Sequence, residues 1–272
     1  LRPRPGDVAI DCTLGGGGHA QAILERIVPG GRLLGLDVDP IERPRTEARL
    51  RAAGFGPGVF VTRQAGFQSL PDVLAREGGG AADVILADLG VSAMQHDDAG
   101  RGFHYKQAGP LDMRMDPSKG ETAAGLIARL SEEDVAALLD ENADEPHAAL
   151  IARVVTRQSI DTTHALERAV RTALNRALPD LPKSAVKMSV RRTFQALRIA
   201  VNGEMAALDG LLRALPGCLA PGGRVAILTF HSGEDRRVKK AFLAGRRAGV
   251  YDAIAERPVR SSMEESRTNR RS

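Results

Sequence analysis

Short apolar runs alternate with segments of helical periodicity over the first 90 residues of the chain. The runs are too short for helices and end at glycines or acidic residues, which is typical of buried strands. The pattern predicts strands at residues 8–12, 32–37, 59–62 and 83–88, and helices at residues 19–27, 42–53 and 70–77. Strands that alternate with helices indicate right-handed crossovers and a mostly parallel sheet.

The alternation stops after the fourth predicted strand. Residues 90–119 are rich in glycine and polar side chains and are predicted to form a loop. Four segments of helical period follow without a strand between them, at residues 122–130, 131–142, 147–157 and 163–178. This part of the chain is therefore predicted to be an all-α insertion.

The strand and helix rhythm then returns. It predicts a helix at 191–215, a strand at 225–230 and a helix at 235–244, and it allows edge strands within 251–259. We therefore predict an α/β fold with a Rossmann-like core in two parts, residues 1–97 and 188–272, and a helical insertion at residues 98–187.

Composition narrows the class of protein. A chain of 272 residues with 43% hydrophobic residues can build a core and is not a disordered chain. Its apolar runs fall far short of the ~20 residues that a membrane span needs, and no apolar signal region follows the basic start. Two cysteines and six histidines show neither a disulfide framework nor metal-ligand spacing. We expect a cytoplasmic protein with no membrane association and no metal.

Positive charge gathers in the later part of the chain, although the net charge is only +4. Basic residues concentrate within 183–198 and 231–272. Two such segments are compatible with an anionic polymer as partner. An aromatic content of 3% argues against a base-stacking platform of the single-strand-binding type.

A glycine-rich turn, DCTLGGGGHA at residues 11–20, joins the first strand to the first helix. Glycines let the backbone turn tightly and approach a ligand beside the helix N-terminus. Asp37 lies at the end of the second strand, where a carboxylate can accept hydrogen bonds from ribose hydroxyls. A glycine turn alone often only closes a strand, but with this acid it predicts a nucleoside-bearing cofactor.

The residues leave two cofactors open. Gly15, Gly17 and Ala20 satisfy the dinucleotide fingerprint, so an NAD-dependent dehydrogenase is one alternative. Asp11 would crowd a pyrophosphate but suits the cationic amino group of a methionine moiety. Asp88 ends the fourth strand, where a methyltransferase of this topology places its target-binding loop. These two carboxylates favour S-adenosylmethionine.

Two further clusters follow strands on the edge where α/β sheets bind ligands. The first runs from Asp88 to Asp116 and is rich in carboxylates and glycine, a composition that is also common in solvated loops. The second, TFHSGED at residues 229–235, follows the fifth strand. His231 within it is either a base or a structural cap.

Eight segments carry a resemblance to a known family: DCTLGGGGHA (11–20), LDVDP (36–40), ILADLGVS (85–92), RGF (101–103), GPLDMRMD (109–116), RTFQALRIAVN (192–202), LAPGGR (219–224) and FHSGEDR (230–236). In this order they resemble the bacterial 16S ribosomal RNA (cytosine-N4) methyltransferase family, RsmH or MraW. The chain departs from the family in reading KMSVRR at 187–192, where His-Pro-Ala-Thr-Arg usually stands, and in having Gly233 in place of leucine.

The resemblance implies a class I S-adenosylmethionine-dependent methyltransferase core with a helical domain after the fourth strand. It implies N4-methylation of a decoding-centre cytidine in 16S ribosomal RNA, within the small ribosomal subunit. The hydrophobic pattern alone predicts that Phe67 is a core residue, whereas the resemblance implies that it forms a wall of the adenine pocket. The cofactor residues that the resemblance implies are Gly17, Gly18, His19, Asp37, Phe67, Asp88 and Gln95.

Chemistry suggests roles for the remaining candidates. An acceptor for the amine hydrogen would make the cytosine nitrogen more nucleophilic, and Asp88 and His231 are the catalytic candidates. We expect RNA phosphates to contact Lys183, Lys187, Arg191, Arg192, Arg198, Arg236 and Arg237, with the helical insertion as substrate-recognition domain. The alternative outside the enzymes is a non-catalytic RNA-binding or ribosome-assembly factor that has the same fold. The complete glycine turn with Asp37 and Asp88 argues against it.

Overall fold

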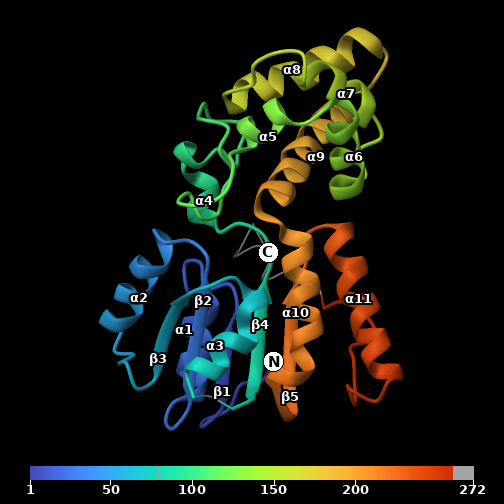
Figure 1. The fold of residues 1–272 in the computed structure, drawn as a ribbon. Helices are drawn as coiled ribbons and strands as arrows, with labels where there is room; N and C mark the ends of the chain where they lie inside the picture. Colours follow the sequence, from blue (N-terminus) through green and yellow to red (C-terminus); the bar gives the residue numbers. More distant parts are fainter. Residues whose placement is uncertain (79, 260–272) are drawn as a thin grey trace.

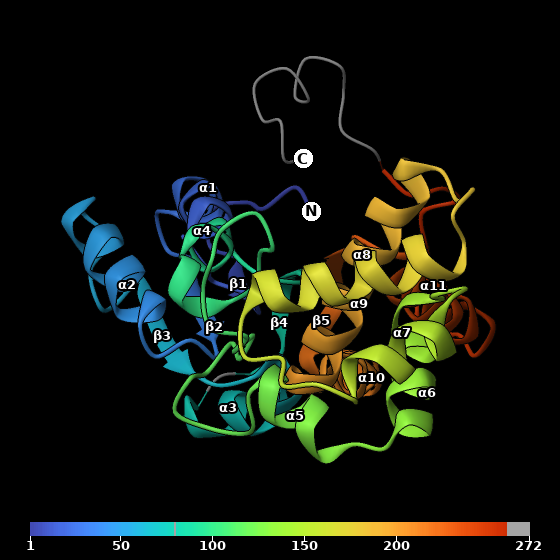
Figure 2. The ribbon, with the colours of Figure 1, turned by 90° about the horizontal axis from the view of Figure 1, so that it is seen from above.

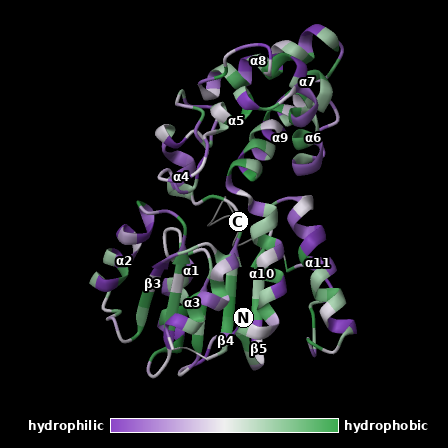
Figure 3. Ribbon diagram, viewed as in Figure 1, coloured by the Kyte–Doolittle hydropathy of each residue, from purple (hydrophilic) through white to green (hydrophobic). Residues whose placement is uncertain are grey.

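The computed structural model describes residues 1–78 and 80–259, and in this part of the chain five strands form one parallel sheet. The strand order is β3-β2-β1-β4-β5. The strands β1, β2 and β4 carry buried apolar side chains on both faces of the sheet, and they are largely hydrophobic in Figure 3. The strands are β1 (Val8–Asp11), β2 (Arg32–Asp37), β3 (Phe60–Gln64), β4 (Ala82–Asp88) and β5 (Leu219–Leu228).

Helices cover both faces of the sheet. The helices α1 (Gly18–Ile27) and α2 (Glu42–Ala52) share a hydrophobic cluster with one face. The other face carries α3 (Leu70–Arg76) and α10 (Glu204–Cys218), and α11 (Ser232–Arg247) packs beside α10. Figure 2 shows the two sets of helices on opposite sides of the strands. The predicted Rossmann-like arrangement is thus confirmed.

The direction in which the sheet grows reverses at β1. The chain moves from β1 to β2 and β3 on one side, and then to β4 and β5 on the other. Parallel α/β sheets bind ligands at the carboxyl ends of the strands beside such a switch point. The glycine turn after β1 and Asp88 at the end of β4 both lie there.

The helical insertion lies above the carboxyl ends of the strands (Figure 1). Its own hydrophobic cluster extends from Phe103 to Leu197. Its helices are α5 (Ala123–Arg129), α6 (Glu132–Ala143), α7 (Ala148–Val155) and α8 (Thr163–Ala177). The short helix α4 (Ala93–Asp97) precedes the insertion, and α9 (Lys183–Asn202) leads from it back to the core. The insertion was predicted to end at residue 187, and α9 continues across that position. The domain boundary itself stays a prediction.

Two predicted elements were wrong, and the segment 90–119, predicted to be a loop, contains α4 and a short 3₁₀ helix (Ala99–Arg101). The single helix expected at 191–215 is divided into α9 and α10, because Gly203 adopts a left-handed conformation (φ 59°) that ends α9. Residues 251–259, all within the described part, contain no strand. Instead Tyr251 packs its ring against Phe242 of α11, with the ring centres 5.5 Å apart.

None of the helices in the described residues is both long and apolar enough to cross a membrane.

Candidate functional site

A cavity of about 690 Å³ lies at the carboxyl edge of the sheet. The segments that follow all five strands line it. Residues of the segment 114–120 in the insertion and of the junction between α9 and α10 line it as well. This volume lies in the usual range of small-molecule sites, about 300–1,000 Å³. The cavity therefore has room for a nucleoside-bearing ligand.

The glycine turn after β1 forms one wall. Gly17 has a φ of 73°, and a Cβ there would lie 2.6 Å from Cγ2 of Thr46 on α2. A side chain at Gly17 is therefore excluded by both conformation and space. Gly18 differs, because a Cβ there would meet no protein atom within 4 Å. Gly18 lines the cavity and leaves its space open for a ligand.

Asp37 connects the end of β2 to this turn. Its Oδ2 accepts the N–H of Gly15 at 2.7 Å, and its Oδ1 accepts the N–H of Asp39 at 2.8 Å. Burial raises the pKa of Asp37 above its ordinary value, in spite of these hydrogen bonds. Each carboxylate oxygen can accept a further hydrogen bond, so Asp37 can hold the turn and bind ligand hydroxyls together.

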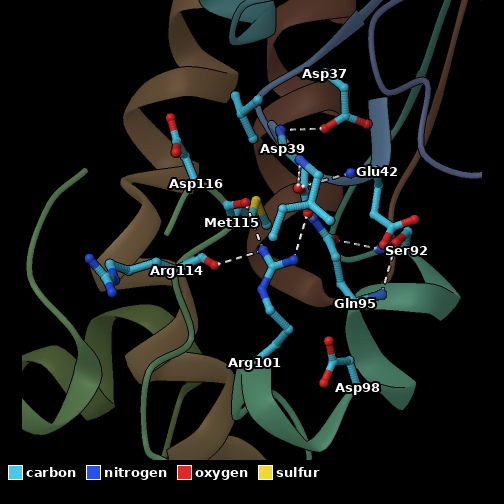
Figure 4. A network of polar contacts seen from close by, with 12 residues as sticks. Asp37, Asp39, Glu42, Ser92, Gln95, Asp98, Arg101, Arg114, Met115 and Asp116 are labelled. Atoms are coloured by element: carbon cyan, nitrogen blue, oxygen red, sulfur yellow. Dashed lines mark hydrogen bonds and ion pairs between the residues drawn. The ribbon is translucent and has the colours of Figure 1, made fainter. Parts of the chain in front are cut away.

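Asp39, two residues further on, is buried and accepts several hydrogen bonds (Figure 4). The sequence alone predicted no role for it. Its Oδ1 accepts the N–H groups of Ile41 and Glu42, at 2.8 and 3.2 Å. Its Oδ2 accepts Nε2 of Gln95 and Nη1 of Arg101, each at 2.8 Å. Burial alone would raise the pKa of Asp39, but its four hydrogen bonds, with those from Gln95 and Arg101 the strongest, together outweigh burial and hold this pKa below its ordinary value.

Arg101 connects Asp39 to the loop that covers the cavity. Its Nη2 donates to the carbonyl oxygens of Arg114 and Met115, at 3.1 and 2.8 Å. Asn202 of α9 holds the same loop, because its Oδ1 accepts the N–H of Met115 at 2.7 Å. The loop is thus fixed on one side by Arg101, which is anchored on Asp39, and on the other side by Asn202 at the end of α9.

Gln95, a predicted cofactor residue, lines the cavity but is also engaged within the protein. Its Oε1 accepts the N–H of Ser92 at 2.9 Å while its Nε2 donates to Asp39. This capping box begins α4 and sets the path of the loop after Asp88. The structure therefore gives Gln95 a role in positioning the wall of the cavity.

Asp88 lies at the end of β4 and faces the glycine turn. Its Oδ2 is 3.5 Å from Nε2 of His19, and its N–H donates to Oγ1 of Thr13 at 2.6 Å. Its Oδ1 is buried and accepts no hydrogen bond from the described residues. Asp88 lines the cavity and its side chain is 32% exposed, so the carboxylate can accept a hydrogen bond from a ligand there.

Asp11 lies behind the turn and is not among the described residues that line the cavity. Its Oδ1 accepts the N–H of Thr13 at 3.1 Å, and its Oδ2 has no partner in the described part of the chain. Burial raises the pKa of Asp11 to about 6. The structure thus does not bring Asp11 to the cavity surface, where the sequence analysis expected it to meet an amino group.

Two aromatic residues stand at opposite ends of the cavity. Phe67 follows β3, at one edge of the sheet, and begins a short 3₁₀ helix (Phe67–Ser69). Phe230 follows β5, at the other edge. Both line the cavity, and Phe230 had no assigned role in the sequence analysis.

His231, the second catalytic candidate, is not one of the described residues that line the cavity. Its Nε2 lies 3.1 Å from Oε1 of Glu234, which does line it. Burial alone would raise the pKa of Glu234, but the nearby His231 and the hydrogen bond from the N–H of Phe230 outweigh burial and hold this pKa below its ordinary value. The structure therefore brings Asp88, and not His231, to the cavity.

The predicted RNA-binding residues fall into two groups. Lys183, Lys187 and Arg191 are exposed on α9, and Arg192 is half-buried; these four form no ion pair with the described residues. The others are paired within the protein: Arg198 with Glu204 at 2.8 Å, Arg236 with Asp144 at 3.3 Å and Arg237 with Asp209 at 3.6 Å. Arg198 also lines the cavity.

Comparison with known proteins agrees with this architecture. The family model described as "MraW methylase family" matches residues 1–272. The chain is 44% identical to "Ribosomal RNA small subunit methyltransferase H 1" of Lachnoclostridium phytofermentans, over 100% of this chain and 75% of the relative. It is 44% identical to "Ribosomal RNA small subunit methyltransferase H 2" of Alkaliphilus metalliredigens, over 100% and 78%. A relative from Sorangium cellulosum, "Ribosomal RNA small subunit methyltransferase H", is 43% identical over 100% and 83%. These matches support neither a dehydrogenase nor a non-catalytic factor.

Proposed function

This chain belongs to the MraW methylase family, and from that membership we propose that it transfers a methyl group from S-adenosylmethionine to N4 of a cytidine in 16S ribosomal RNA. Its relatives carry the name ribosomal RNA small subunit methyltransferase. The observation that carries the proposal is the continuous cavity from the glycine turn and Asp37 to the partly exposed carboxylate of Asp88.

The residues of the cavity fit this cofactor. The open space at Gly18 admits a ligand beside the N-terminus of α1, and Asp37 has acceptor capacity for two ribose hydroxyls. Phe67 offers a flat apolar wall one strand further along the sheet. When bound, S-adenosylmethionine supplies an electrophilic methyl group on a cationic sulfur.

Asp88 is the residue that we assign to the acceptor amine. The lone pair of a cytosine amine is delocalised into the ring, so the nitrogen is a poor nucleophile. A hydrogen bond from N4–H to the Asp88 carboxylate would orient the amine and localise its lone pair on the nitrogen, which would favour attack on the methyl group that the cofactor supplies. The proton leaves N4 toward the Asp88 carboxylate or a water molecule.

The substrate side of the proposal rests on charge. Lys183, Lys187 and Arg191 present unpaired positive charge on α9, which leads from the insertion into the cavity. We assign them to RNA phosphates, with the small ribosomal subunit in the cytoplasm as the partner. Contacts to phosphate make binding depend steeply on salt.

The proposal is tested by methyl transfer from labelled cofactor to small ribosomal subunits that lack the modification, followed by nucleoside analysis. We expect N4-methylcytidine, and we expect Asp88→Asn to lower kcat by about 100-fold or more. Free 16S RNA in a parallel reaction distinguishes RNA from the assembled subunit as substrate. A protein that binds S-adenosylmethionine but yields no N4-methylcytidine from either substrate would refute the proposal.

A further inference from the structure

Phe230 is unusual among the aromatic side chains. Of the seven phenylalanines and two tyrosines, all in the described part of the chain, it alone is exposed. Its exposed fraction is 61%, whereas Phe60, Phe103 and Phe194 are at least nine-tenths buried. An aromatic side chain gains its main stabilisation from burial, so an exposed ring on a cavity wall adds little to the fold. Such a ring is available to a ligand.

The position of Phe230 is nevertheless fixed. Its N–H donates to Oε2 of Glu234 at 2.7 Å, and the carboxylate of Glu234 is itself buried beside His231. This bond sets the backbone between the end of β5 and the start of α11. The ring is therefore presented at the cavity by a rigid backbone, although the ring itself is not packed.

Phe230 is close to the proposed reacting centre in the sheet register. Asp88 of β4 pairs with Leu228 of β5, so Phe230 stands two residues beyond the direct neighbour of Asp88. The expected cofactor residues all follow β1, β2, β3 or β4, and none follows β5. The end of the cavity beside β5 consequently has no cofactor residue assigned to it.

Arg198 supplies a hydrogen-bond donor to the same end. Its Nε and Nη2 donate to the two carboxylate oxygens of Glu204, at 2.8 and 2.9 Å. Its Nη1 has no acceptor among the described residues and would lie 3.7 Å from a Cβ on Gly90, two residues after Asp88. The cavity is thus lined by the partly exposed carboxylate of Asp88 and by Arg198, whose Nη1 donates to none of the described residues.

We infer that this end of the cavity is a subsite for one unpaired cytosine base of the RNA, with the ring of Phe230 as its stacking face. The inference rests on the proposed function. A base that leaves its helix loses its stacking partners, and an aromatic ring replaces them. Cytosine presents an amine donor beside ring acceptors, which the oxygen of Asp88 and Nη1 of Arg198 complement.

The test compares Phe230→Leu, which keeps an apolar side chain, with Phe230→Tyr, which keeps the ring. Leu243→Ala is the matched control, because Leu243 is exposed on α11 but does not line the cavity. Stacking on one base corresponds to a change of about 10- to 100-fold in affinity. We expect Phe230→Leu to raise KM for small subunits by that factor and Phe230→Tyr to stay within about threefold of the unmodified enzyme. Binding of S-adenosylhomocysteine, measured by calorimetry, should be unchanged in all three variants.

A second readout separates this inference from the proposed function. Saturation-transfer NMR detects contact between the enzyme, loaded with S-adenosylhomocysteine, and the ring protons of cytidine monophosphate. If the enzyme methylates cytidine but Phe230→Leu matches it in KM, the subsite is wrong and the function stands. If the enzyme does not methylate cytidine, the function fails; the subsite then survives only if the NMR contact is present and is lost in Phe230→Leu.

Discussion

The buried ion pair of Asp39 and Arg101 should be the most sensitive point of the site to mutation. The Asp39 carboxylate is fully buried, and the Arg101 side chain is 9% exposed. Arg101→Met keeps the length and apolar volume of the side chain but removes the guanidinium. It leaves the Asp39 charge without its cation and removes the donor to the carbonyls of residues 114 and 115.

The magnitude follows from the burial of the pair. Loss of one partner of a buried ion pair costs about 3–5 kcal/mol, because the remaining charge is uncompensated. This is a large share of a typical unfolding free energy of about 5–15 kcal/mol. Arg129→Met is the matched control, since Arg129 pairs with Glu121 at 2.9 Å with both side chains at least 40% exposed. It should cost much less than Arg101→Met, because solvent screens an exposed pair.

Urea unfolding followed by circular dichroism measures both free energies, and calorimetry with S-adenosylhomocysteine measures the site. We expect Arg101→Met to lower both the unfolding free energy and the affinity. In a double-mutant cycle with Asp39→Asn, the coupling should exceed about 1 kcal/mol. Equal costs for Arg101→Met and Arg129→Met would refute the reasoning.

Acid should weaken the same pair. The native pKa of Asp39 lies below its ordinary value, so the unfolded chain binds the proton more tightly than the native state does. The contribution of the pair is therefore complete above the unfolded pKa and is lost as the pH falls through the native pKa. Arg101→Met should have a smaller loss of stability in this acidic range than the unmodified protein.

Three further predictions concern the turn, its buried acid and the RNA surface. Burial raises the pKa of Asp11 to about 6, so native Asp11 keeps its proton where the unfolded chain has lost it. The unfolding free energy should fall by about 3 kcal/mol as pH rises from about 4 to 6, and urea unfolding of Asp11→Asn should not show this fall. The same pH dependence of the unfolding free energy in both proteins would contradict the prediction. Gly17→Ala should cost about 1–3 kcal/mol in urea unfolding. Gly18→Ala should leave unfolding unchanged but weaken S-adenosylhomocysteine binding, and unchanged affinity would exclude a ligand from that space. Lys187→Ala should reduce the salt slope of RNA binding by about 1, whereas Arg76→Ala, in the last turn of α3, should not.

The sheet was predictable because its strands carry a local signal. Strands β1, β2 and β4 are buried on both faces and therefore appear as apolar runs in the sequence. The division between α9 and α10 was not predictable, because hydrophobic periodicity continues across Gly203 although the backbone conformation of that residue ends the helix. Periodicity reports which face is buried, and it does not report where a helix changes direction.

The site shows the same limit. Asp37 and the glycine turn were found because strand order and spacing alone bring them together. Asp39 and Arg101 are 62 residues apart, and their contact depends on how the loop after β4 folds back. The strings LDVDP and RGF pointed to both residues, but neither string says that they touch. Phe230 had no signal of its own, because an apolar residue after a strand is usually buried.

The insertion and the cavity are parts of one structure. Asn202, the last residue of α9, donates from Nδ2 to the carbonyl of Met113 and accepts the N–H of Met115, both in the loop that Arg101 holds from the other side. Arg198, one helical turn earlier, lines the end of the cavity beside β5. A shift of α9 at its exposed cations would therefore also move the cavity wall, because one continuous helix joins the two. If RNA binds α9 as proposed, its contacts there would set the position of the residues proposed to meet the base.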